Sequence, residues 1–235
     1  RARPDAIIVA GGEHATAMPE YILRDCPEID NVVSGEGELA FLELCHAVFH
    51  NKAPKNIGGV SYLDHDGCYI PNGLSRRIMA LDEMPRPAWH LCPINSYFID
   101  NWTMGIATGR NMPILATRGC PYQCTFCSNP TMWTTRYLMR PVVDVVDEIS
   151  FLIKDYQASS IDFFDLTAIV KKDWIIEFCK NLKERGINVV WQLPSGTRSE
   201  ALDSQTLKAI YDAGCRYLVY APESGSKESL QKIKK

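Results

Sequence analysis

From residue 113 onward, short apolar runs alternate with amphipathic stretches in a regular order. The runs have the length of buried strands, and the stretches between them carry apolar residues at helical spacing. Asp203 and Gly214 stand where the start and end of one such helix are expected. Strands are predicted at 113–117, 160–164, 188–193 and 216–221, and helices at 141–156, 173–185, 203–213 and from Ser226.

Short loops between strands and helices favour a parallel sheet that closes toward a barrel, with the helices outside. Four strand–helix units cannot close an eight-stranded barrel. The sequence therefore predicts an α/β protein whose C-terminal part, 113–235, is the N-terminal portion of an incomplete parallel (β/α) barrel.

The N-terminal part also alternates strands and helices. A buried strand is expected at 5–10, a second at 29–33, and a hairpin from 58–63 and 68–70 around Asp66-Gly67. These elements predict the C-terminal half of a doubly wound Rossmann-like domain. A helix is predicted over 38–49, with an inward apolar face made of Leu39, Leu42, Cys45, Val48 and Phe49.

Three regions follow from these patterns. Residues 1–73 form the Rossmann-like portion, 74–112 form a linker rich in proline and polar residues, and 113–235 form the barrel portion. The chain opens directly into a strand and closes within an amphipathic helix, so we expect a fragment of a longer protein.

Composition narrows the partners. The formal net charge is −3 and Lys/Arg runs are absent from the sequence, so no nucleic-acid partner is expected. No apolar run approaches 18 residues and no signal peptide is recognisable, so we expect no membrane segment and a cytoplasmic protein. Cysteines are usually reduced in that compartment, and close groups of them indicate metal or redox chemistry.

Three of the nine cysteines lie within the segment RGCPYQCTFCSNP, as Cys120, Cys124 and Cys127. The segment leaves the end of the first predicted barrel strand, and the ends of parallel strands are where function gathers. Three thiolates can bind three irons of a [4Fe–4S] cluster and leave the fourth iron open. A structural zinc site needs four ligands, and the nearest other candidates are Cys92 and His90.

The stretch CPYQCTFC resembles the signature of the radical S-adenosylmethionine (radical SAM) superfamily, with Phe126 in the aromatic position. PESGSKESLQKIKK is similar to the segment at the fourth strand of that family. The resemblance implies a [4Fe–4S] cluster on Cys120, Cys124 and Cys127 whose open iron chelates S-adenosyl-L-methionine. It also implies reductive cleavage to a 5′-deoxyadenosyl radical, a small-molecule substrate, and an electron donor of the flavodoxin or ferredoxin type.

A second resemblance lies in the N-terminal part. IIVAGGEHATAMPEYI, IDNVVSGEGELAFLEL and PRPAWHLCP resemble the subfamily in which a cobalamin-binding domain precedes the barrel. It implies cobalamin contacts at Gly11, Gly12, Gly35 and Gly37, where the missing side chain lets the backbone approach a large flat ligand. The implied reaction is methyl transfer to an unreactive carbon, or cyclisation or rearrangement; turn glycines without a ligand are the alternative.

Four residues follow the later barrel strands and are candidates for contacts with S-adenosylmethionine. Asp165 follows the second strand and either contacts the amino group of the ligand or caps the next loop. Arg198 follows the third strand and either pairs with a carboxylate or lies on the surface. Glu223 and Ser224 end the fourth strand; they bind the ribose or methionine part, unless Ser224 caps the next helix.

Two other functions remain possible from the sequence. A methylthiotransferase-type radical SAM enzyme without cobalamin would share the cysteine segment but normally carries cluster cysteines in its N-terminal domain. Residues 1–73 contain only Cys26, Cys45 and Cys68, widely spaced. A non-enzymatic iron–sulfur or zinc module would need a fourth protein ligand.

Overall fold

The structure, a computed structural model, describes residues 3–198 and 202–235. The described chain divides into two compact units. The first contains the described residues up to Met79 together with Tyr122–Arg136, and the second contains Ala80–Pro121 together with the described residues of Tyr137–Lys235. Cys124 and Cys127 therefore lie in the first unit and Cys120 in the second.

The first unit is built on a four-stranded sheet of order β1-β2-β3-β4. β1 and β2 are parallel, whereas β2 pairs with β3, and β3 with β4, in antiparallel register. The predicted hairpin is thus present as β3 and β4. The elements of this unit are β1 (Val9–Gly11), α1 (Glu13–Ala17), α2 (Pro19–Asp25), β2 (Asn31–Val33), α3 (Gly37–Phe49), β3 (Val60–Leu63), β4 (Tyr69–Pro71) and α5 (Asn129–Met132).

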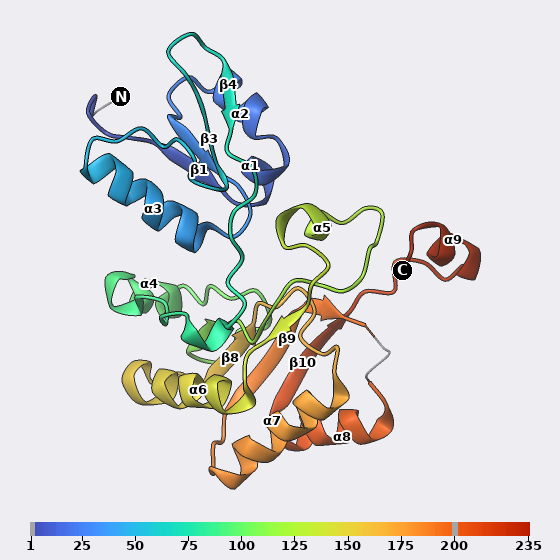
Figure 1. The fold of residues 1–235 in the computed structure, drawn as a ribbon. Helices are drawn as coiled ribbons and strands as arrows, with labels where there is room; N and C mark the ends of the chain where they lie inside the picture. The colour runs from blue at the N-terminus through green and yellow to red at the C-terminus, as the bar shows by residue number, and fades with distance from the viewer. Residues whose placement is uncertain (1–2, 199–201) are drawn as a thin grey trace. The chain divides into compact units, whose positions relative to one another are not determined.

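Helices cover both faces of this first sheet (Figure 1). Val33 and Val60 pack with Leu44 of α3 on one face. Val32 packs with Leu23 of α2 on the other, because successive strand residues point to opposite faces. A sheet with helices on both faces is the predicted doubly wound arrangement.

Two predictions for the first unit were wrong. The strand expected to be buried at 5–10 is only Val9–Gly11, and Ile7 is 47% exposed, because it precedes the first pair of the β1–β2 ladder, Val9 with Asn31. The inward face of α3 was also misassigned. Ala40 and Leu44 face the sheet, while Phe49 is 82% exposed. Small residues let the helix approach the sheet, and a helix that is apolar on several sides gives no single period.

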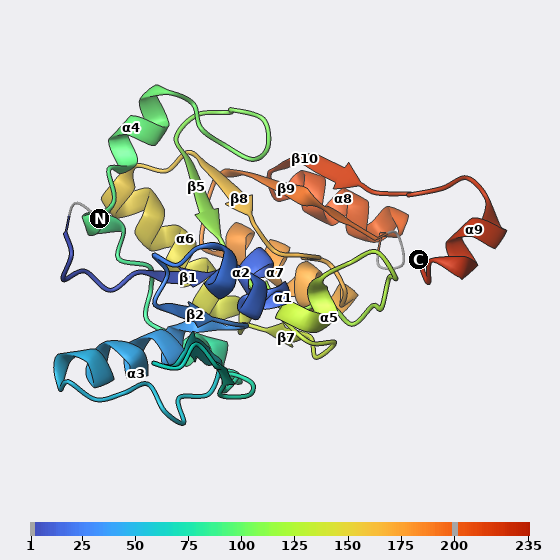
Figure 2. The same cartoon turned by 90° about the horizontal axis from the view of Figure 1, so that it is seen from above.

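The second unit contains the expected parallel sheet, with the order β10-β9-β8-β5. All three neighbouring pairs of strands are parallel. Helices α6, α7 and α8 lie along one face of this sheet (Figure 2) and share one core with it. The predicted incomplete parallel barrel is confirmed. Its elements are β5 (Asn111–Ile114), α6 (Val142–Tyr156), β8 (Ser160–Phe163), α7 (Lys172–Glu184), β9 (Val190–Thr197), α8 (Ser204–Asp212), β10 (Cys215–Tyr220) and α9 (Lys227–Lys232).

Several short elements complete the second unit. The region expected to be a linker contains the 3₁₀ turns η1 (Leu81–Glu83) and η2 (Trp89–Leu91) and the helix α4 (Ile94–Ile99). After β5, the two-residue strands β6 (Thr117–Arg118) and β7 (Leu138–Met139) pair antiparallel across the cysteine segment. Within the described residues, no helix combines the length and apolar character needed to cross a bilayer.

Candidate active site

The three cysteines lie on one continuous stretch of chain that leaves β6. Cys120 comes two residues after Arg118, the last residue of β6, and is half-buried. Cys124 is half-buried and Cys127 is exposed. The backbone N–H of Cys127 donates to the carbonyl oxygen of Cys124 at 3.1 Å, so these two cysteines stand on a tight turn. Convergence of the three thiols on one metal remains a prediction.

The sulfur of Cys127 also accepts a hydrogen bond. The backbone N–H of Asn129, the first residue of α5, donates to Cys127 Sγ at 3.5 Å. Donors of this kind stabilise negative charge on a metal-bound thiolate. The donor set therefore suits an iron–sulfur cluster: cysteine sulfurs on an accessible loop, one of them hydrogen-bonded by the backbone.

The chain entering this segment from β5 is held by Asp165, which is 1% exposed. Its two carboxylate oxygens accept the N–H of Ala116 at 3.1 and 3.2 Å. The Thr117 hydroxyl donates to the same carboxylate. Burial raises the pKa of Asp165 to about 6, although these hydrogen bonds act in the opposite direction. Asp165 therefore binds the chain before the cysteines, and both its contact with a ligand and its capping of the next loop remain predictions.

Arg140 also binds the chain between β5 and Cys120. Its N–H donates to Ala116 O at 2.8 Å, and its Nη1 donates to Leu115 O at 2.8 Å. Its guanidinium also pairs with Glu148 at 2.5 Å and with Asp144 at 2.6 Å, both on α6. Arg86 pairs with the same two carboxylates. Burial raises the pKa of Glu148, and Arg140 opposes this shift.

Tyr137 is a neighbour of this group that the sequence analysis did not select. Its hydroxyl donates to the carbonyl oxygens of Thr167 at 3.2 Å and Ala168 at 3.4 Å. Burial raises its pKa above the ordinary value; a hydrogen bond with Thr117 lowers it, while the charges of Asp165 and Cys120 raise it further. Tyr137 therefore keeps its proton. Nothing in the sequence separates it from the other tyrosines, whereas the spacing of Arg140 and Asp144 is a recognisable i, i+4 ion pair.

Arg198 and Glu223 lie after the C-terminal ends of their parallel strands, as Asp165 does. Arg198 directly follows β9 and is half-buried. Glu223 follows β10 in a left-handed conformation (φ 60°), and its carboxylate pairs with Lys235 at 3.1 Å. Since the C-terminal ends of parallel strands share one edge, Asp165, Arg198 and Glu223 follow the same edge of the second sheet.

Ser224 does not cap a helix. Ser226 is the N-cap of α9 and its side chain accepts the N–H of Ser229, whereas Ser224 Oγ accepts the N–H of Ser226 at 3.1 Å. The capping alternative for Ser224 is therefore wrong. Contacts of Ser224, Arg198 and Glu223 with S-adenosylmethionine remain predictions.

The four candidate glycines of the first unit have different surroundings. Gly11 ends β1 and Gly12 follows it, both are exposed, and a Cβ on Gly12 would meet no atom within 4 Å. Gly12 has φ 94°, which a side chain would strain. Gly35 (φ 76°) instead donates its N–H to Thr16 Oγ1 at 2.9 Å. Gly37 starts α3, and its Cβ would lie 3.6 Å from Val33. Of the four, only Gly12 has open space where a Cβ would be, because a Cβ on Gly11 would lie 3.5 Å from Val33 O.

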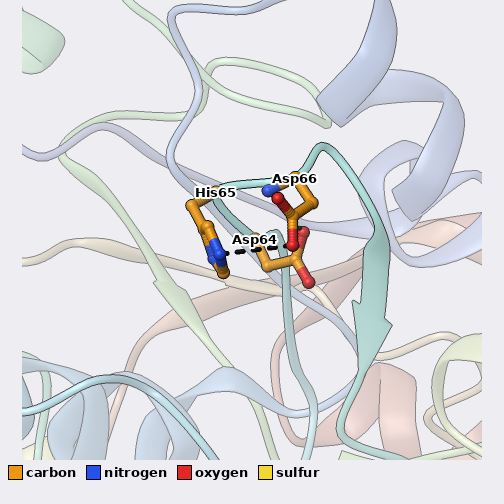
Figure 3. A group of neighbouring side chains, drawn as sticks. All are labelled: Asp64, His65 and Asp66. Atoms are coloured by element: carbon orange, nitrogen blue, oxygen red, sulfur yellow. Dashed lines mark hydrogen bonds and ion pairs between the residues drawn. The ribbon is translucent and has the colours of Figure 1, made fainter.

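Among the described residues, the one group of three possible metal ligands whose ligand atoms all lie within 4.8 Å is Asp64, His65 and Asp66 (Figure 3). It lies at the tip of the β3–β4 hairpin. Asp64 Oδ1 accepts the N–H groups of Asp66 and Cys68, which is how an aspartate closes a turn. His65 pairs with Asp66 at 3.2 Å with both side chains largely exposed. These contacts describe a hairpin turn.

Comparison with protein families matches both parts of the chain. The model of the radical SAM superfamily matches residues 114–235, and the model of the B12 binding domain matches residues 1–45. The first match covers β8, β9 and β10, the last residue of β5, and all three cysteines. The second covers β1, α1, α2, β2 and the start of α3.

Curated relatives align over nearly the whole chain. An uncharacterised methyltransferase of Pyrococcus horikoshii is 32% identical over 98% of this chain and 48% of its own length. The anaerobic magnesium-protoporphyrin IX monomethyl ester cyclase of Rubrivivax gelatinosus is 30% identical over 99% of this chain and 41% of its own length. The chain thus spans less than half the length of these relatives.

Solved structures share the fold. The cobalamin-dependent S-adenosylmethionine radical enzyme OxsB aligns with a TM-score of 0.78 at 19% identity, over 97% of this chain and 32% of OxsB. The radical S-adenosylmethionine methyltransferase TsrM of Kitasatospora setae aligns with a TM-score of 0.76 at 20% identity, over 98% of this chain and 44% of TsrM. At these identities the likeness describes the fold.

Proposed function

The chain belongs to the radical SAM superfamily, and from this premise we propose that it is part of a cobalamin-dependent radical SAM enzyme. The observation that carries the proposal is the C-x₃-C-x₂-C segment in the connection between β5, the first strand of the parallel sheet, and α6. Cys120, Cys124 and Cys127 would hold a [4Fe–4S] cluster and leave one iron for S-adenosylmethionine. The whole protein would act on a small-molecule substrate in the cytoplasm.

When bound, the cluster and S-adenosylmethionine supply a 5′-deoxyadenosyl radical and cobalamin supplies a methyl carrier. The residues of the chain hold and orient these groups. Asp165 and Arg140 fix the backbone before Cys120, and Tyr137 keeps a neutral hydroxyl beside them. Arg198, Glu223 and Ser224 follow the same edge and would contact S-adenosylmethionine.

Cobalamin would lie against Gly11, Gly12, Gly35 and Gly37, which follow the ends of β1 and β2; at Gly12 a Cβ would meet no atom within 4 Å. The B12-binding match to residues 1–45 supports this placement. We propose methyl transfer to an unreactive carbon as the reaction, with cyclisation or rearrangement as the other possibilities. The relatives include proteins named as methyltransferases and a protein named as a cyclase. A flavodoxin or ferredoxin would supply the electron.

Anaerobic reconstitution with iron and sulfide tests the cluster. The whole protein should take up about four irons per chain. Replacing Cys120, Cys124 and Cys127 together with Ala should abolish this iron, whereas Cys92→Ala should retain it. Loss of iron in Cys92→Ala, or a colourless zinc complex in the unchanged protein, would overturn the proposal in favour of a structural metal site.

A further inference from the structure

Glu36 and Arg77 form a buried ion pair in the first unit. Arg77 Nε lies 2.5 Å from Glu36 Oε1, and the two side chains are 14% and 3% exposed. Glu36 follows β2 as the N-cap residue of α3, and its carbonyl oxygen accepts the Ser75 hydroxyl at 2.6 Å. A buried ion pair is a weak device for stability, because desolvation of the charges offsets much of their attraction. The role of the Glu36–Arg77 pair is therefore better explained by the segments of chain that the two side chains bind.

Arg77 also binds the chain that follows the cysteines. Its Nη1 donates to Thr134 Oγ1 at 2.9 Å and to the carbonyl oxygen of Arg136 at 2.6 Å. Thr134 has φ 61°, a conformation that β-branched residues rarely adopt. Such a conformation persists where surrounding contacts fix it, and the two bonds from Arg77 do so here.

Thr134 in turn connects to a cysteine. Its carbonyl oxygen accepts Asn129 Nδ2 at 3.1 Å, and Asn129 is 2% exposed. The backbone N–H of the same Asn129 donates to Cys127 Sγ. A continuous series of contacts therefore runs from Glu36 through Arg77, Thr134 and Asn129 to Cys127, all within one unit.

A second attachment supports the same segment. The Thr16 hydroxyl accepts the N–H of Gly35 at 2.9 Å and contacts Met132 Sδ at 3.2 Å. A Cβ on Gly35 would lie 3.8 Å from Met132 O. The glycine-rich segment 34–37 is thus contacted twice: Met132 lies against Gly35, and Arg77 pairs with Glu36.

We propose that Glu36 and Arg77 are positioning residues for the cysteine segment: they hold residues 129–136 so that the N–H of Asn129 meets Cys127 Sγ. This inference rests on the proposed cluster. A hydrogen bond to a cluster sulfur favours the more negative, reduced state and so raises the reduction potential. The ion pair therefore makes the cluster easier to reduce.

The test uses Arg77→Gln, Glu36→Gln and Arg77→Lys in the whole protein. Arg24→Gln is the matched control, because Arg24 pairs with Glu20 at 2.9 Å in the same unit with both side chains about half exposed. Two quantities are measured: the reduction potential of the reconstituted cluster, and deuterium uptake of residues 128–136 in the metal-free protein.

Arg77→Gln and Glu36→Gln should shift the potential to more negative values and speed deuterium uptake over 128–136. Arg77→Lys should have a reduction potential and a deuterium uptake between those of these two variants and those of the unchanged protein. The reason is that a lysine ammonium keeps the pairing with Glu36 but lacks the planar guanidinium that reaches Thr134 and Arg136. Arg24→Gln should change neither quantity. The near-isosteric Glu36→Gln and the charge-conserving Arg77→Lys keep the test valid if Arg77→Gln does not fold.

Two failures are distinguishable. If the unchanged protein takes up no iron, the proposed function fails. Suppose instead that the unchanged protein takes up about four irons, but Arg77→Gln and Glu36→Gln have the same reduction potential or the same deuterium uptake as the unchanged protein. The proposed function then stands and the positioning role is overturned.

Discussion

Asp165 carries a carboxylate that is costly to ionise where it lies. Its side chain is buried, and burial raises its pKa from 3.8 to about 6. The folded protein therefore binds a proton more tightly than the unfolded chain between these two values. The contribution to stability is fully present below the unfolded value and is lost as the pH rises through the folded value.

Asp165→Asn removes this titration while keeping a side chain of the same shape. From pH 4 to pH 7, the free energy of unfolding of the unchanged protein should fall by about 2 kcal/mol relative to that of the variant. Urea unfolding of both metal-free proteins across this range measures the difference. A difference that stays constant with pH would show that Asp165 keeps an ordinary pKa.

Arg140 lies between two acidic side chains of α6 that have little access to water. Arg140→Met should destabilise the protein by about 3–5 kcal/mol, because it leaves Glu148 buried beside a single remaining cation, Arg86. The double variant Arg140→Met/Glu148→Met should recover most of this loss. Arg185→Met, which breaks an exposed pair with Asp147 on the same helix, should cost no more than about 1 kcal/mol. Equal losses for Arg140→Met and Arg185→Met in urea unfolding would contradict this view.

At the scale of elements, the segment before β5 lies close against the second sheet. Ile106 donates its N–H to Gln192 Oε1 at 2.9 Å and accepts Gln192 Nε2 at 2.7 Å. Gly105 permits this approach, since a Cβ there would lie 2.5 Å from Gln192 Oε1. Gln192 also donates to the buried Asp162 at 3.0 Å.

Gly105→Ala should therefore destabilise the second unit by about 1–3 kcal/mol, because Gln192 must move and release the backbone of Ile106. Gly225→Ala is the control, since a Cβ there would meet no atom within 4 Å; it should change stability by no more than about 0.5 kcal/mol. Thermal unfolding of both variants measures the effect. A Gly105→Ala variant as stable as Gly225→Ala would mean that the close approach carries no strain.

The elements that the sequence predicted well are those with strong local signals. Asp203 caps α8 by accepting the N–H of Thr206 at 2.8 Å, and Ser226 caps α9. The four parallel strands follow from their apolar runs. The orientation of α3 was wrong because which face is buried depends on the sheet it meets, and Ala40 beside Leu44 gives little periodic signal.

At the scale of the whole molecule, the sequence was most informative about the cysteines and the order of strands. It could not indicate that Cys124 and Cys127 would pack with the N-terminal unit, because Arg77 and Thr134 are 57 residues apart. The same holds for Arg86 and Tyr137, whose partners are distant in the chain. Contacts of this kind depend on the tertiary fold and leave no local pattern.

The most direct measurement of the proposed function is electron–nuclear double resonance on the reduced cluster with S-adenosylmethionine labelled in its amino and carboxylate groups. An iron without a protein ligand should bind both groups, so hyperfine coupling from both labels is expected. Replacement of Cys120, Cys124 and Cys127 with Ala should remove the signal. A reduced cluster that shows no coupling to either label would mean that the fourth iron is held by the protein, and would contradict a radical SAM function.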